Sequence, residues 1–266
     1  MKHTKEKITE LFSYAVELFN DTMGEEYSVG DNGIMLRFFT PDNGIEVYEE
    51  FCSTYFPRHL NEDYRHREKF ENMAAEAFAS EGHKGVMIRT DLPFSEPELL
   101  QIYAHEIAHI YCTLNEIKGE NFYTKYCDAP DHPIYGENVS TEMNGYINAG
   151  YAVWREMVAD IISMEAIIDI CQLRISKKMI QDLYEQMAYG NPGAKAAAAR
   201  MIAFVMLKNE RDIAKKYPFF NKSTIRMLEL VKQNLDAQPF FEITPDFIAK
   251  LGSAYLMALT EKMFGR

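Results

Sequence analysis

Two histidines and a glutamate stand close together in an arrangement that can hold and use a metal ion. His105 and His109 are four positions apart, and Glu106 lies between them. On an α-helix, residues at positions i and i+4 lie one turn apart on the same face, so both imidazoles can bind one ion. Glu106 is about 100° further round the helix, where its carboxylate can face a metal-bound water without binding the metal. This arrangement is typical of zinc hydrolases.

Chance does not explain this motif, and its surroundings favour a helix. With 7 histidines in 266 residues, about 0.02 matches to H-E-x-x-H are expected at random. The motif lies in a run of apolar residues at helical spacing, over residues 99–111. Ser95 and Glu98 form the S-x-x-E pattern of a capping box, and Pro97 stands in the first turn, where its missing N–H is harmless. We therefore predict one helix that carries the whole motif.

A catalytic zinc ion usually has three protein ligands and one water, so a third ligand must come from elsewhere in the chain. The metzincin pattern would place a glycine and a histidine after the motif, but Cys112 and Asn115 occupy those positions. His132, which stands on a predicted loop, is one alternative. Glu156 is the other, and it shares a face of a predicted helix with Asp160 at positions i and i+4.

The segment 154–160, Trp-Arg-Glu-Met-Val-Ala-Asp, resembles the third-ligand motif of the gluzincins, the thermolysin-like zinc peptidases. In that family a helix with the pattern E-x-x-[AS]-D follows the H-E-x-x-H helix. The resemblance covers roughly residues 96–170. It implies that Glu156 is the third zinc ligand and that Asp160 accepts a hydrogen bond from His105 outside the ligand sphere. His132 remains the reserve ligand, and the gap of 47 residues between His109 and Glu156 implies an insertion.

Together, the motif and the resemblance predict a zinc-dependent metallopeptidase that acts on a peptide or protein substrate. Bound Zn²⁺ lowers the pKa of its water toward ~7, and Glu106 would accept the proton as general base and return it to the leaving amine. The tetrahedral oxyanion also needs a hydrogen-bond donor. The resemblance implies a tyrosine or histidine from later in the chain, for which Tyr217 is the first candidate and Tyr184, Tyr189 and His132 are competitors.

Two other functions fit parts of the pattern. A regulatory protease of the ImmA/IrrE type, which cuts one specific intracellular protein, also carries H-E-x-x-H with a downstream acidic ligand. A binding protein with a zincin fold would keep a structural or vestigial metal and no activity. Glu106 argues against this second alternative, because a structural zinc site closes with four protein ligands and has no use for a carboxylate that faces water.

The composition limits the partners and the compartment. A net charge of −12 and a pI near 5.1 argue against nucleic acid and anionic membranes as partners, since both select clustered Lys and Arg. Cys52, Cys112, Cys127 and Cys171 are widely spaced and form no C-x-x-C motif, which is typical of reduced thiols. We find neither a signal-peptide core nor a transmembrane pattern, and we therefore expect a cytoplasmic protein.

The elements that must position these residues are mainly helical. The strand predicted at residues 85–89 precedes the motif helix, and it is either buried or a sheet edge that pairs with an extended substrate. A strand is also predicted at 33–39 and a strand or short helix at 45–56. Helices are predicted at 6–20, 62–80, 176–189, 194–208, 223–235 and from 245 onward, and the helix that carries Glu156 is expected to continue over 161–173.

We expect these elements to form an α+β, mainly helical, zincin-like domain over residues 1–266. A small N-terminal sheet lobe with the motif helix would cover residues 1–118, and a helical lobe with the third ligand would cover 148–266, with the zinc cleft between them. Residues 119–147 are rich in Pro, Gly, Asp and Asn and are predicted to be an insertion loop, placed to cover the cleft.

Overall fold

The protein is mainly helical and contains one small three-stranded sheet, which confirms the predicted α+β class. The chain forms two compact units, residues 1–115 with 162–173 and residues 116–161 with 174–266. No helix among the described residues is both long enough and apolar enough to cross a membrane. This computed structural model describes residues 3–60, 65–80, 82–115, 140–168, 170, 174–188, 190–191, 193–237 and 243–264.

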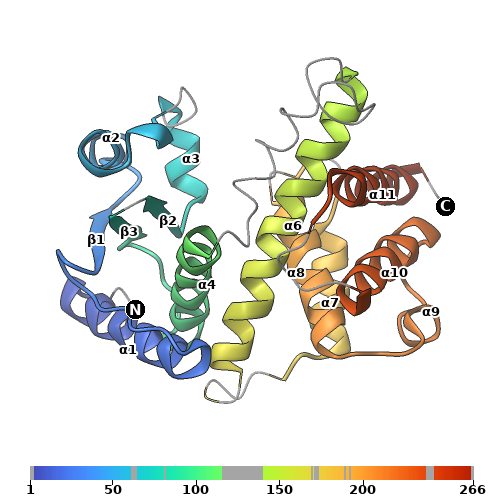
Figure 1. The fold of residues 1–266 in the computed structure, drawn as a ribbon, viewed down its shortest axis with the longest axis horizontal. Helices are drawn as coiled ribbons and strands as arrows, with labels where there is room; N and C mark the ends of the chain where they lie inside the picture. The colour runs from blue at the N-terminus through green and yellow to red at the C-terminus, as the bar shows by residue number, and fades with distance from the viewer. Residues whose placement is uncertain are drawn as a thin grey trace. The chain divides into compact units, whose positions relative to one another are not determined.

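The first unit places three strands among helices (Figure 1). The strand order is β1-β3-β2, with β1 parallel and β2 antiparallel to β3. Helix α2 packs on β1, α4 packs on β2, and α1 packs on α4. The elements are α1 (Lys5–Met23), β1 (Ile34–Phe39), α2 (Gly44–Tyr55), the 3-10 turn η1 (Pro57–His59), α3 (Arg67–Asn72), β2 (Ala75–Ser80), β3 (His83–Arg89) and α4 (Glu96–Leu114).

An aromatic cluster covers one part of this sheet and ties α2 and α3 to all three strands. Its rings meet mostly edge to face, as Phe51 and Phe78 do at 5.7 Å between centroids, the arrangement that aromatic quadrupoles favour. Cys52 lies in the cluster as a buried free thiol, and burial raises its pKa to about 12. The buried members are Met35, Phe39, Tyr48, Phe51, Cys52, Phe56, Phe70, Phe78 and Met87.

The sheet decides one open alternative and corrects one prediction. Strand β3 lies in the centre and is buried, so for residues 85–89 the buried strand is confirmed and the sheet edge is excluded. The helix predicted over residues 62–80 is wrong for its second half, where β2 pairs with β3 from Ala75 opposite Ile88 to Ser80 opposite His83. The alanine-rich sequence favours a helix, but the turn into β3 contains Gly82 with a φ of 88°, which brings the segment back along its partner.

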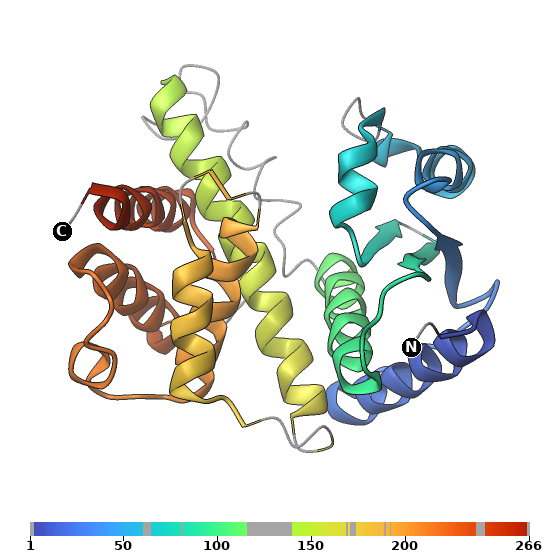
Figure 2. The ribbon, with the colours of Figure 1, turned by 180° about the vertical axis from the view of Figure 1, so that it is seen from behind.

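The second unit is built from helices (Figure 2). Helix α7 packs on α8, and α10 packs on α11. The short helix α9 was not predicted from the sequence. The elements are α6 (Thr141–Ile167), which belongs to this unit up to Ile161, α7 (Lys177–Gln186), α8 (Ala194–Leu207), α9 (Ile213–Lys216), α10 (Lys222–Ala237) and α11 (Pro245–Phe264).

Helix α6 begins earlier than the sequence predicted. The insertion was expected over residues 119–147, but residues 141–147 already belong to α6, and 119–139 lie outside the described residues. The Ser140 hydroxyl accepts a hydrogen bond from the Met143 N–H at 3.1 Å, which satisfies one of the donors that a helix start leaves without a partner. From this cap the helix continues through the Asn-Gly pair at 144–145, within the segment that was predicted to be a loop.

Two glycines let α6 and α11 touch through their backbones within the second unit. A Cβ atom on Gly150 would lie 2.0 Å from the Ile248 carbonyl oxygen, and one on Gly252 would lie 1.8 Å from the Tyr146 carbonyl oxygen. Both distances are far inside van der Waals contact, so only glycine fits at either position. One turn past Gly150, the buried Trp154 packs edge-on against Phe247, with 5.2 Å between the ring centroids.

Candidate metal centre

Helix α4 carries the whole H-E-x-x-H motif, as predicted. The helix starts with the predicted capping box, in which the Ser95 N–H donates to Glu98 Oε2 at 2.8 Å. The same carboxylate accepts a hydrogen bond from the Ser95 hydroxyl at 2.7 Å, and these bonds lower the pKa of Glu98. Apolar residues at helical spacing, such as Tyr103 and Ile107, are fully buried and anchor the helix in the first unit.

The two histidines of the motif point at a common position. Their Nε2 atoms lie 3.0 Å apart, and their rings stand perpendicular with centroids 4.5 Å apart. In a tetrahedral zinc site with Zn–N bonds of 2.0–2.1 Å, two ligand nitrogens are about 3.3 Å apart. His105 is partly exposed and His109 is buried, so an ion between them would be reached from the side of His105.

Glu156 completes a group that could hold a metal ion. His105, His109 and Glu156 each offer one ligand atom, and these atoms all lie within 4.8 Å of one another. Two imidazole nitrogens and one carboxylate oxygen form a donor set that suits zinc and neighbouring transition metals, whereas Ca²⁺ and Mg²⁺ prefer oxygen ligands alone. His132, the reserve ligand, lies outside the described residues.

Arg155 binds the same carboxylate. Its Nε and Nη2 atoms donate to Glu156 Oε1 at 3.1 and 2.8 Å. Consecutive helical residues point in different directions, so the arginine side chain has to bend back to make this contact. The pair is accessible to solvent, with side-chain exposures of 47% for Arg155 and 21% for Glu156.

The predicted general base, Glu106, lies on α4 between the two histidines. Glu106 is buried, with 8% of its surface exposed. A carboxylate at this depth keeps little contact with bulk water, which favours the exchange of a proton with one bound water molecule over exchange with solvent. Its role as general base stays a prediction.

Asp160 has a partner that the sequence did not reveal. It is buried, and its Oδ1 accepts hydrogen bonds from Arg200 Nε at 3.2 Å and Nη2 at 3.1 Å. Arg200 lies on α8, 40 residues further along the chain, and nothing in the local pattern of either helix indicates the pair. This ion pair holds Asp160 through one oxygen, and the predicted hydrogen bond from His105 stays a prediction.

Tyr217, the first candidate for the oxyanion donor, lies in an aromatic cluster of the second unit. The side chain is fully buried, its ring centroid is 5.3 Å from that of Phe220, and its hydroxyl has no hydrogen-bond partner among the described residues. Burial raises its pKa to about 12, with a smaller contribution from the charge of Glu210. Tyr184 contacts the same cluster and accepts a hydrogen bond from the Asn221 N–H at 3.3 Å, whereas Tyr189 lies outside the described residues.

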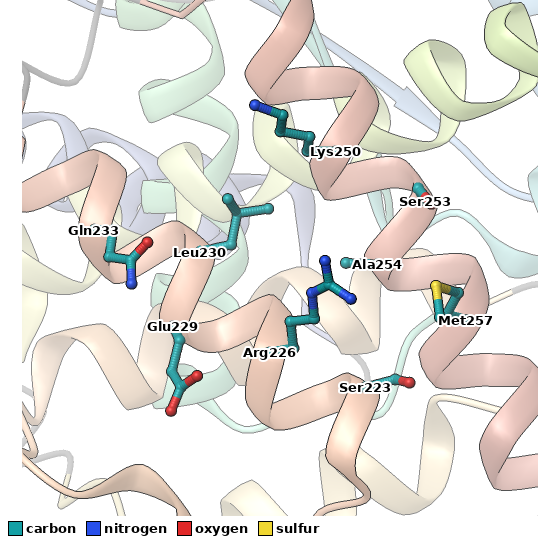
Figure 3. Close-up of a pocket in the computed structure, with 9 residues that line it drawn as sticks. All are labelled: Ser223, Arg226, Glu229, Leu230, Gln233, Lys250, Ser253, Ala254 and Met257. Carbon is teal, nitrogen blue, oxygen red and sulfur yellow. The ribbon is translucent and has the colours of Figure 1, made fainter.

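A surface pocket of about 380 Å³ between α10 and α11 contains none of the predicted site residues. Figure 3 shows the Arg226 guanidinium extending from α10 toward Ala254 of α11. The remaining lining residues are Ser223, Glu229, Leu230, Gln233, Lys250, Ser253 and Met257.

Comparisons of the chain with protein-family models, with curated proteins and with solved structures found no match. The function therefore has to be inferred from the chemistry of the side chains described above.

Proposed function

We propose that the protein is a zinc-dependent metallopeptidase of the gluzincin type. The observation that carries this proposal is the group formed by His105, His109 and Glu156, with ligand atoms within 4.8 Å of one another. Three protein ligands leave one tetrahedral position for water, which distinguishes a catalytic zinc site from a structural one. Glu106, next to the first histidine, supplies the carboxylate that such a site needs for proton transfer.

The residues of the chain would divide the reaction as follows. When bound, zinc supplies a water of lowered pKa and polarises the substrate carbonyl. His105, His109 and Glu156 hold the ion and fix its open position. Glu106 accepts the proton of the attacking water and then donates it to the nitrogen of the leaving amine, so that the amine leaves in its neutral form.

Strand β2 supports a peptide as the substrate. It is an edge strand of the sheet, it pairs with β3 alone among the described residues, and it packs against the motif helix α4. An edge strand offers backbone N–H and C=O groups to an extended peptide. A regulatory protease of the ImmA/IrrE type would use the same centre and would differ in the choice of one protein substrate.

The first test is the metal. Protein purified without added metal should contain about one zinc per chain by elemental analysis, because structural and catalytic zinc sites of this ligand type bind tightly. Less than about a tenth of an equivalent, with no increase when zinc is added, would contradict the proposal.

The second test separates catalysis from metal binding. Glu106→Gln should keep the zinc and lose about 10²- to 10⁴-fold in peptide hydrolysis, because the amide has the same shape but cannot accept the proton. Cleavage can be followed by mass spectrometry of a proteome-derived peptide mixture. Glu96→Gln is the matched control, since Glu96 lies in the exposed first turn of the same helix and forms an ion pair with Lys7 at 3.5 Å. Hydrolysis by Glu106→Gln at the wild-type rate would show that Glu106 is not the general base, and absence of hydrolysis by the zinc-loaded wild type would favour a binding protein.

A further inference from the structure

Arg155 and the proposed metal compete for one carboxylate. The guanidinium donates hydrogen bonds to Glu156 Oε1 at 3.1 and 2.8 Å, so the negative charge of this carboxylate faces a cation. A zinc ion carries twice the charge of a guanidinium and approaches a carboxylate oxygen to about 2.0–2.2 Å. Because Coulomb attraction grows with charge and falls with distance, Glu156 would direct most of its charge to the metal.

Metal binding therefore changes the surroundings of Arg155. Two neutral imidazoles and one carboxylate would leave a bound Zn²⁺ with a net charge of +1, which the carboxylate of Glu106 offsets, and Arg155 adds a positive charge beside Glu156. With almost half of its side chain exposed, the guanidinium can be reached by a molecule that arrives from solution. The partner that such a site favours is an anion, and the planar guanidinium matches the two oxygens of a carboxylate.

We propose that Arg155 recognises a carboxylate of the substrate close to the scissile bond, so that the preferred substrates are peptides with an acidic group at that place. This inference rests on the proposed peptidase function and adds the substrate class. The carboxylate can be the C-terminus of a peptide or the side chain of an Asp or Glu. The first source would make the protein an exopeptidase, and the second would make it an endopeptidase with an acidic preference.

Binding without turnover provides the first test. Zinc-loaded Glu106→Gln protein is titrated by NMR with N-acetyl-Phe-Gln as free acid, N-acetyl-Phe-Glu-amide, and N-acetyl-Phe-Gln-amide. One of the two acids should bind about 10- to 100-fold more tightly than the neutral amide, the range expected for hydrogen bonds to a charged group. The acid that binds identifies the source of the carboxylate.

The difference should depend on Arg155. Adding Arg155→Gln should bring the acids to the affinity of the neutral amide, and Arg155→Lys should restore part of the difference, because lysine keeps the charge without the paired donors. Arg226→Gln is the matched control, an exposed arginine of the second unit in the pocket of Figure 3, and it should change nothing.

The outcomes separate this inference from the proposed function. Equal binding of acids and amide to protein that holds one zinc would overturn the role of Arg155 and leave the peptidase proposal intact. Failure of the protein to bind zinc at all would refute both. In active protein, Arg155→Gln should raise KM for acidic substrates by about 10-fold or more with kcat little changed, because substrate binding alone is weakened.

Discussion

Helices α4 and α6 both carry predicted site residues, but they are positioned in different ways. In α4, the capping box joins Ser95 to Glu98, three residues away, and the two histidines are one turn apart. In α6, the start of the helix is also capped locally, by Ser140, but the packing around Glu156 comes from a distant part of the chain. Gly150 meets α11 through its backbone, and Trp154 packs on Phe247 of the same helix.

This difference predicts which site residues keep their positions when other parts of the chain are substituted and which do not. The pair of imidazoles follows from the geometry of one helix, so any change that leaves α4 folded leaves the pair in place. Glu156 and Asp160 depend on long-range packing, including the Arg200 ion pair, so a change far from the metal can displace them. The following predictions test this contrast, in order of decreasing effect.

The largest effect is expected from removing the ligand that α6 provides. Loss of a hydrogen-bond partner of a metal ligand typically lowers metal affinity by about 10- to 100-fold. Glu156→Ala removes a ligand itself and should therefore lower zinc affinity by more than this range. His132→Ala is the control and should leave zinc affinity unchanged. Zinc affinities are measured by competition with a chelator. Unchanged affinity in Glu156→Ala together with a loss in His132→Ala would show that His132, not Glu156, is the third ligand.

The glycine contact between α6 and α11 comes next. Gly150→Ala and Gly252→Ala should each lower the free energy of unfolding by about 2–3 kcal/mol, because the new methyl group collides with backbone that cannot move aside. Gly145→Ala, on the same helix with open space around it, should raise the free energy of unfolding by about 0.5–1 kcal/mol. Urea denaturation measures all three, and equal effects at 145 and 150 would show that the helices do not touch there.

Asp160 should have a smaller effect on the metal. Asp160→Asn should weaken zinc affinity or activity by about 10–100-fold while the metal still binds, as expected for an outer partner of a ligand. Arg200→Gln should act in the same direction, because it leaves the buried carboxylate without its ion-pair partner. Unchanged zinc affinity in both variants would limit this ion pair to a structural role.

Tyr217 should have the smallest effect at neutral pH. Tyr217→Phe removes a buried hydroxyl without a partner among the described residues, so the free energy of unfolding at pH 7 should change by less than about 1 kcal/mol. The pKa of Tyr217 is about 12 in the folded protein, above the ordinary value of 10.0. Between these two values the unfolded chain loses the proton and the folded protein keeps it, so stability falls as pH rises, and the variant should lose this part of the slope.

The same variant tests the predicted oxyanion donor. A fully buried hydroxyl does not contact substrate, so we expect Tyr217→Phe to retain activity. A loss of about 10²- to 10³-fold, the usual effect of removing an oxyanion donor, would instead establish the catalytic role predicted from the sequence.

Local patterns were sufficient for most helices and failed where pairing between strands decided the structure. The helix over α1 and the strand β1 follow from apolar periodicity and flanking turn signals, and both are confirmed. Strand β2 was mistaken for helix because its alanines favour a helix in isolation, whereas in the structure it pairs with β3 across the short turn at Gly82. The sequence also left undecided whether β3 is a central or an edge strand, because the sequence of one strand does not reveal which strands pair with it.

The sequence by itself determined the composition of the motif and the geometry of its two histidines. Backbone hydrogen bonds between residues four apart repeat every turn, so His105 and His109 had to share a face once the capping box started the helix. Only the tertiary structure shows that a carboxylate oxygen of Glu156 lies near them and that Arg200, 40 residues beyond Asp160, binds the Asp160 carboxylate. A separation of 40 residues follows no helical or strand period, so no local pattern could indicate this ion pair, which exists because the fold brings two distant parts of the second unit together.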